Sequence, residues 1–155
     1  MSTKEIVNAF YEAFKHKDYK TMQSLYALNA QFSDEVFKGL NGFEAGKMWE
    51  MLIKSGKDLQ IDYEILDTAK NVAKVRWIAN YTFSKTGRKV KNIVTSNFEI
   101  DDGKIYAQRD SFSFSKWSKQ ALGFVPWLMG FTGIPQKKVQ EAAARGLNDF
   151  IRKNP

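Results

Sequence analysis

The chain of 155 residues contains no cysteine and a single histidine, His16. The absence of cysteine excludes a disulfide scaffold, a thiolate metal site and a cysteine nucleophile. With one histidine, a transition-metal site would need a shell made mainly of carboxylates, and the sequence shows no such cluster. His16 lies at the end of a predicted helix, where a cation interacts favourably with the helix dipole. Glycine-rich phosphate-binding patterns are also missing, so we expect neither a metal nor a cofactor.

Long hydrophobic runs are missing as well. The apolar positions near the N-terminus are interrupted by Asn8 and Glu12, which predicts a helix and no signal peptide, so we expect a cytoplasmic protein. Residues 120–136 carry no charge, but they are fewer than the about 20 that span a bilayer, so no transmembrane segment is expected. We expect this stretch to be buried on its own domain or across a two-fold interface. A membrane-surface segment is the alternative, and Trp117 and Trp127 are candidates for a lid or a subunit contact.

The net charge of +7 is unevenly distributed. From residue 116 to the end there are seven basic and two acidic residues, which places five of the net positive charges in the last forty residues. Such a segment can bind nucleic acid or an anionic membrane surface, but it is more often the solvated face of a helix. Because no DNA-binding or RNA-binding motif accompanies it, we expect no nucleic-acid partner.

Helical patterns dominate the first third of the chain. Ser2 and Glu5 form a capping box, and the apolar residues that follow recur at helical spacing. Asp18 is a natural cap for a second helix, whose apolar residues run as far as Tyr26. A short strand, AQFSDEVF, then precedes a third helix that ends at Ser55-Gly56.

The apolar period then changes from 3.6 to 2, which predicts strands in residues 59–67, 72–84, 90–100 and 104–114. The turns KTGR and Asp101-Asp102-Gly103 join the last three into an antiparallel meander. Because the helices come first and the strands follow, the fold class is α+β. A last helix is predicted after Pro135.

This order of elements resembles the nuclear-transport-factor-2-like superfamily, which includes ketosteroid isomerases, SnoaL-like polyketide cyclases and limonene-type epoxide hydrolases. The segment AFYEAFKHKDYKTMQSLYALNAQFSDEVFKG resembles the opening helices and first strand of the family. The segment FEIDDGKIYAQRDSFSF resembles its final hairpin, where an Arg-Asp-aromatic pattern follows a DGKI turn. The resemblance covers about residues 3–115. It implies a single domain over residues 1–155, in which residues 116–155 form a helical C-terminal extension.

The resemblance also implies a cone-shaped, curved antiparallel sheet that wraps around the N-terminal helices and encloses an apolar pocket. A pocket of this kind suits an apolar small-molecule ligand, and a few polar groups inside it set the chemistry. The superfamily has many non-catalytic members, so the fold does not decide the function. We also expect a homodimer. The candidate pocket residues are Phe10, Tyr11, Trp49, Trp77, Tyr81, Ser96, Phe98, Tyr106 and Phe112.

Asp110 is the strongest candidate for a catalytic residue. It shares strand parity with Tyr106 and Phe112, so a carboxylate is predicted on the face that carries aromatic residues. Burial there would raise its pKa and make it a general acid or base. It matches the acidic residue of the SnoaL-like and epoxide-hydrolase families. The alternative is a structural carboxylate paired with Arg76, Arg109 or a helix N-terminus.

Asp34 is the second candidate, and it resembles the general base of ketosteroid isomerases. The hydrogen-bond donors of those enzymes correspond here to Phe10 and Ser96, and phenylalanine cannot donate, so that activity is not expected. The epoxide-hydrolase pattern is also incomplete, because the preceding strand offers no Asp before Asp101. Alternatively, Asp34 caps the loop before Gly39.

The leading interpretation is a small-molecule-binding, SnoaL-like domain that catalyses acid–base isomerisation or cyclisation of an apolar carbonyl compound. Asp110 and Asp34 would transfer the proton, without a metal or cofactor. The alternative is a non-catalytic ligand-binding or dimerisation module of the same fold.

Overall fold

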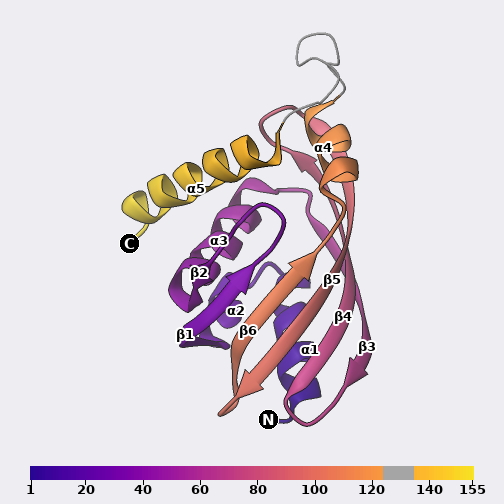
Figure 1. Ribbon diagram of the computed structural model, residues 1–155, viewed down its shortest axis with the longest axis vertical. Helices are drawn as coiled ribbons and strands as arrows, with labels where there is room; N and C mark the ends of the chain where they lie inside the picture. Colours follow the sequence, from indigo (N-terminus) through magenta and orange to yellow (C-terminus); the bar gives the residue numbers. More distant parts are fainter. Residues whose placement is uncertain (124–134) are drawn as a thin grey trace.

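A computed structural model describes residues 1–123 and 135–155 of the chain (Figure 1). Within them, helices α1 and α2 come first, strands β1 and β2 and helix α3 follow, strands β3 to β6 complete a six-stranded sheet, and helices α4 and α5 come last. The predicted α+β class, with N-terminal helices against a curved sheet and additional C-terminal helices, is confirmed. The centre of the stretch 120–136, including Trp127, lies outside the described residues.

The N-terminal helices begin where their capping residues predict. Helix α1 (Thr3–Lys15) starts with a complete Ser2–Glu5 capping box, and α2 (Tyr19–Ser24) starts at Asp18, whose side chain accepts from the backbone of Thr21. Helix α3 (Gly42–Ser55) is capped in the same reciprocal way by Asn41 and Glu44. These side chains satisfy backbone N–H groups that have no partner inside the helix.

The second helix is shorter than its apolar pattern predicts. It ends at Ser24, and Tyr26 instead opens strand β1 (Tyr26–Ser33) beside Ile105 of the last strand. The prediction that Tyr26 belongs to the helix is therefore wrong, because strand pairing overrides the local helical spacing.

The sheet has the order β2-β1-β6-β5-β4-β3. Strands β3 (Gln60–Thr68), β4 (Val72–Phe83), β5 (Arg88–Asp101) and β6 (Lys104–Ser111) form the predicted antiparallel meander. The short β2 (Leu40–Asn41) pairs antiparallel with β1, whereas β1 and β6 run parallel. At the β5–β6 turn, Asp102 and Gly103 both have positive φ, as a two-residue hairpin turn requires.

The core lies between the inner face of the sheet and helices α1 and α3. Figure 1 shows α1 running behind the long strands, with α3 beside β1 and β2. The predicted apolar stripe of α1 is buried, as are most of the predicted inward residues of β4 and β5; Tyr81 and Phe83 at the end of β4 are partly buried. The interior is aromatic: the ring of Phe10 lies 5.1–5.9 Å from the rings of Tyr11, Tyr26, Trp49 and Phe98.

The last strand is shorter than predicted, and the C-terminal extension begins earlier. The last strand ends at Ser111 and does not reach Phe114, because Ser113 caps helix α4 (Phe114–Leu122) by accepting from the backbone of Lys116. Helix α5 (Gln136–Lys153) follows Pro135 as predicted and buries Leu147 against the core. No helix among the described residues is long and apolar enough to cross a membrane.

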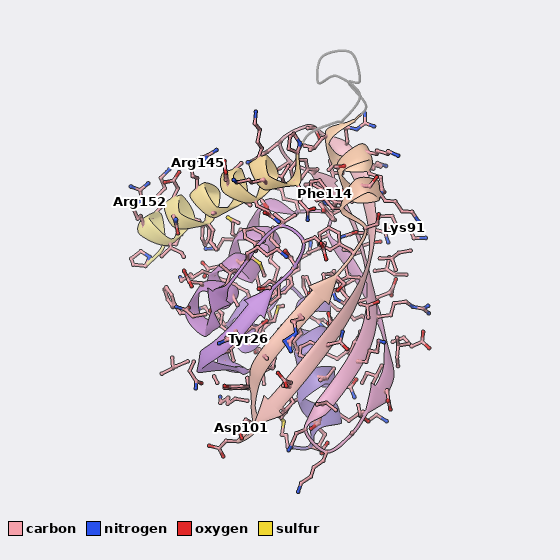
Figure 2. The ribbon with its side chains drawn as sticks, in the orientation of Figure 1. Tyr26, Lys91, Asp101, Phe114, Arg145 and Arg152 are labelled. Atoms are coloured by element: carbon pink, nitrogen blue, oxygen red, sulfur yellow. The ribbon has the colours of Figure 1, made fainter. Side chains whose placement is uncertain are left out.

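The basic residues of α5 lie on its outer face. Arg145 and Arg152 are exposed and project away from the sheet (Figure 2). The C-terminal end of the helix is tied to α3 by Lys47, whose ammonium group donates to the carbonyl of Asn154 at 2.7 Å. This arrangement matches the expectation that the basic tail forms a solvated helix face.

Candidate functional site

Asp110 points into the interior of the molecule. It lies near the end of β6, directly opposite Ser96 of β5, and residues that face each other in an antiparallel pair share one side of the sheet. Ser96 is fully buried and Asp110 is 4% exposed. The predicted inward orientation of Asp110 is therefore confirmed.

The two oxygens of the Asp110 carboxyl group have different surroundings. Oδ1 accepts a hydrogen bond from the hydroxyl of Ser96 at 2.5 Å and another from the amide nitrogen of Gln108 at 3.1 Å. Oδ2 is buried and has no hydrogen-bond partner among the described residues. A buried polar atom without a partner is uncommon in proteins, and it marks a position where a proton, water or ligand atom is expected.

Two chains of hydrogen bonds converge on Oδ1. On one side, Ser96 accepts from the hydroxyl of Tyr11 at 3.0 Å and from the indole of Trp77 at 2.8 Å. Tyr11, on α1, therefore reaches the carboxyl group through Ser96, on β5. This chain uses three of the residues that the sequence placed in the pocket.

The second chain contains Trp49, which the sequence placed in the pocket, and two residues that it did not predict for the site, Gln108 and Tyr26. Gln108 is fully buried, and its side-chain oxygen accepts from the hydroxyl of Tyr26 at 2.5 Å. Tyr26 in turn accepts from the indole of Trp49 at 2.8 Å. Figure 2 labels Tyr26 on β1, next to β6. Gln108 could have been found from its strand parity with Asp110, but Tyr26 was hidden by its helical spacing.

In the part of the chain that the structure describes, no cationic side chain donates a hydrogen bond to Asp110. Arg76 pairs with Glu64 at 2.8 Å and Arg109 approaches Glu99 at 3.7 Å, with all four side chains more than half exposed. The alternative in which Arg76 or Arg109 pairs with Asp110 is therefore wrong, because both arginines lie on the solvent-facing side of the sheet.

Burial, together with a smaller contribution from the nearby charge of Asp34, raises the pKa of Asp110 to about 7 against the opposing hydrogen bonds from Ser96 and Gln108. Desolvation disfavours the charged carboxylate, and neutral donors offset only part of that cost. Burial likewise raises the pKa of Tyr11 and Tyr26 well above that of a free tyrosine, so both remain neutral donors.

Asp34 lies just after β1 and combines the two roles considered for it. Its Oδ1 accepts from the backbone N–H groups of Val36 at 2.7 Å and Phe37 at 2.6 Å, so it caps this loop. Burial nevertheless raises its pKa to about 6, against these backbone hydrogen bonds. Asp34 is thus a second carboxyl group that titrates near neutral pH and acts electrostatically on Asp110.

The predicted pocket residues lie together, but their side chains fill the space around the site. Phe10, Tyr11, Trp49, Trp77 and Phe98 belong to one buried cluster, in which their rings contact one another. An interior cavity therefore stays a prediction. A hollow of about 450 Å³ among the described residues lies at the surface and is lined by Arg88, Lys89, Lys119 and Gln120.

Tyr81 and Phe112 lie at the edge of this cluster. Both are partly buried, and both also contact a second apolar cluster that includes Trp117 of α4. The Trp117 indole donates to the Tyr81 hydroxyl at 2.8 Å, and burial raises the pKa of Tyr81. Trp117 thus covers the end of the sheet near Asp34, whose charge also acts on Tyr81.

Tyr106 does not face the interior, so its prediction as a pocket residue is wrong. Glu99 pairs with Ala107 and Ile100 pairs with Ile105, which leaves Tyr106 as an extra residue in β6. This β-bulge shifts the alternation of inward and outward side chains by one position. Ile105 is consequently buried, and Tyr106 is 41% exposed.

Comparison with solved structures identifies the fold. An NTF2-like protein from Burkholderia thailandensis matches with a TM-score of 0.69 at 16% identity, over 77% of this chain and 97% of its own. A candidate polyketide cyclase from Silicibacter sp. matches with a TM-score of 0.68 at 19% identity, over 76% and 93%. An LEH-like epoxide hydrolase from Mycobacterium tuberculosis matches with a TM-score of 0.61 at 19% identity, over 81% and 93%. The chain therefore has the nuclear-transport-factor-2-like fold.

The sequence assigns the chain to a family within that fold. Residues 7–108, well over half of the chain, match the model of the SnoaL-like domain. The chain belongs to the SnoaL-like domain family. No curated protein matches the chain in sequence.

Proposed function

We propose that this protein is an acid–base catalyst that acts on an apolar carbonyl compound, with Asp110 as the group that exchanges a proton with the substrate. The observation that carries the proposal is the buried Oδ2 of Asp110, which has no partner among the described residues although Oδ1 accepts two hydrogen bonds. A carboxyl group of purely structural use would be expected to engage both oxygens.

The pKa of Asp110 suits proton transfer in both directions. General acid–base catalysis is most efficient when the pKa of the catalytic group lies near the working pH. With a pKa of about 7, Asp110 is present in both protonation states at neutral pH. The ionised Oδ2 can remove a proton from the carbon next to a carbonyl, leaving an enolate, and the protonated group can return that proton at the same or another carbon.

The surroundings of Asp110 favour an apolar substrate. The side chains nearest the site are aromatic, and the polar groups are neutral donors already directed towards Oδ1. An anionic substrate would lose its hydration without gaining a cation in exchange. Asp34 supports the proposal as a second group that titrates near neutral pH.

A non-catalytic ligand-binding or dimerisation module is the second candidate. It is favoured by the tight contacts among Phe10, Trp49, Trp77 and Phe98, which leave the interior filled by side chains. In that case Asp110 would help to specify one arrangement of the core, and the family fold would serve to hold a ligand or a second copy of the chain. Sedimentation equilibrium tests the homodimer directly.

The deciding experiment is proton exchange. A panel of apolar ketones and enones is incubated with the protein in D₂O at pH 7, and deuterium incorporation next to the carbonyl is followed by NMR. We expect at least one compound to exchange with the wild-type protein and to lose that exchange with Asp110→Asn. Glu64→Gln, which removes a carboxylate from the outer face, is the control and should retain it. Equal exchange with Asp110→Asn and the wild type would exclude the proposed role.

A further inference from the structure

Both chains of hydrogen bonds that end at Asp110 begin at a tryptophan. The indole of Trp49 donates to Tyr26, and the indole of Trp77 donates to Ser96, each at 2.8 Å. An indole N–H can donate a hydrogen bond but cannot accept one. The two tryptophans therefore set the direction in which the hydrogens of both chains point.

On the side of Trp49, this direction determines how the Gln108 amide is oriented. Tyr26 accepts from Trp49, so its single proton is available for Gln108, whose side-chain oxygen lies 2.5 Å away. The amide oxygen of Gln108 is thereby held at Tyr26, and its nitrogen is held 3.1 Å from Oδ1 of Asp110. The reverse orientation would leave the buried Tyr26 proton without an acceptor.

On the side of Trp77, the same logic applies to a hydroxyl group. Ser96 accepts from both Trp77 and Tyr11, which occupies the two lone pairs of its oxygen. Its single proton is therefore directed to Oδ1 of Asp110, at 2.5 Å.

The two donors at Oδ1 leave that oxygen without a lone pair for a proton of its own. We infer that Gln108 and Tyr26, with Trp49 behind them, are positioning residues that confine the exchangeable proton of Asp110 to Oδ2. The inference rests on the proposed role of Asp110 in proton transfer. It adds that the transfer takes place at one defined oxygen and that β1 and α3 contribute the residues that select it.

The groups that act electrostatically on Asp110 come from helix α1, strand β1 and the loop after β1. They are Tyr11 on α1, Tyr26 on β1 and Asp34 just after β1. The tyrosines stay neutral over the range in which Asp110 titrates, and Asp34 is the one charged neighbour among them. A change in the titration of Asp110 on removal of the Tyr26 hydroxyl therefore reports on the hydrogen-bond chain and not on a lost charge.

The test is the titration of the Asp110 carboxyl carbon, followed by ¹³C NMR in protein labelled at aspartate. Tyr26→Phe removes one hydroxyl, frees the Gln108 amide to turn and weakens its donation to the ionised carboxylate. We expect the pKa of Asp110 to rise by about half a pH unit or more, since a lost donor to the charged form disfavours that form. Trp49→Phe should cause a smaller rise in the same direction.

Tyr63→Phe is the matched control. The Tyr63 hydroxyl also forms hydrogen bonds to side chains, those of Asn8 and Glu12. It lies outside both chains of hydrogen bonds that lead to Asp110. It should leave the Asp110 titration unchanged. If Tyr26→Phe does not fold, Gln108→Met removes the donor itself and is expected to raise the pKa of Asp110 by at least as much.

The wild-type protein provides a measurement that needs no variant. The side-chain NH₂ resonances of Gln108 should shift with pH at the same midpoint as the Asp110 carboxyl carbon. The inference is overturned if these resonances do not follow Asp110, or if Tyr26→Phe folds and leaves the titration unchanged. If the titrations of Asp110 and Gln108 behave as inferred but Asp110→Asn retains full proton exchange with a carbonyl compound, the proposed function fails. The inference that Gln108 and Tyr26 confine the proton of Asp110 to Oδ2 would still stand.

Discussion

Two carboxyl groups of this protein are almost equally buried, but their pKa values are shifted in opposite directions. Glu50 on α3 is 6% exposed, and Asp110 on β6 is 4% exposed. Glu50 contacts the ammonium groups of Lys47 at 3.3 Å and Lys54 at 2.8 Å, and the amide of Gln23 at 3.1 Å. Burial alone would raise its pKa, but the hydrogen bonds from Lys54, Gln23 and Lys47 outweigh it, so the pKa of Glu50 is lowered.

The comparison shows that the partners of a buried carboxylate, and not its burial alone, decide what it can do. Glu50 stays ionised and joins α2, α3 and, through Lys47, the end of the chain at Asn154. Asp110 has neutral donors on one oxygen and no partner on the other among the described residues, so its pKa rises to about 7. The first arrangement stabilises the fold, and the second is the one that the proposed proton transfer would use.

The largest expected effect that tests this comparison is that of Asp110→Asn. The folded protein binds the Asp110 proton more tightly than the unfolded chain does, because the pKa is raised from 3.8 to about 7. The stabilisation that this group contributes to the folded state is fully present below about pH 4, and it is lost as the pH rises towards 7. Asparagine is neutral at every pH, so at pH 8 the variant should be more stable than wild type by roughly 2–4 kcal/mol.

Urea unfolding at pH 4 and pH 8 checks this result. At pH 4, where Asp110 is protonated, the two proteins should differ little because the amide and the neutral acid have similar shapes. An advantage of Asp110→Asn that is the same at both pH values would show that the difference does not come from titration of this carboxyl group.

The equivalent change at the other carboxylate should have the opposite sign. Glu50→Gln removes a charge that Lys47 and Lys54 approach, and Lys47 is only 13% exposed. Hydrogen bonds to charged groups contribute about 1.5–3 kcal/mol, so the variant should be destabilised by about 1–3 kcal/mol at pH 8. If Glu50→Gln were stabilising in the same unfolding experiment, the distinction between the two sites would be wrong.

Asp34→Asn is expected to have a smaller effect on stability and a separate effect on Asp110. The pKa of Asp34 is raised to about 6, so its contribution is also lost as the pH rises from about 4 to about 6. The residue is partly exposed, so solvent screens part of this effect and the gain at pH 8 should be about 1 kcal/mol. Removing this negative charge should also lower the pKa of Asp110, which ¹³C NMR can measure; an unchanged midpoint would show that the two carboxyl groups do not interact.

Much of the fold follows from local patterns. The predicted capping residues Ser2 and Asp18 lie where helices begin, and the alternation of apolar residues in β4 and β5 predicts most of their buried faces correctly. These features depend on neighbours within a few residues. The inward orientation of Asp110 was also predictable, because the bulge that changes the parity of β6 lies before it, at Tyr106.

The hydrogen-bond network could not be predicted in the same way. The bonds from Tyr11 to Ser96 and from Tyr26 to Gln108 join residues that are more than 80 positions apart. Tyr26 also follows a helical spacing up to the point where pairing with β6 makes it a strand residue. Parity within a single strand indicates which way a side chain points, but it does not say which other element meets it there.

The smallest expected effect concerns a third carboxylate, Glu64, which pairs with a cation but is exposed to solvent. Its ion pair with Arg76 spans 2.8 Å on the outer face, where both side chains are more than half exposed. Water screens such pairs, so Glu64→Gln should change the free energy of unfolding by less than about 0.5 kcal/mol. The variant also frees Arg76, one of the two arginines considered as partners of Asp110. If the sheet keeps Arg76 outside, the midpoint of the Asp110 ¹³C titration should not move; a fall in that midpoint would mean that the arginine reaches the interior and that Asp110 can acquire a cation.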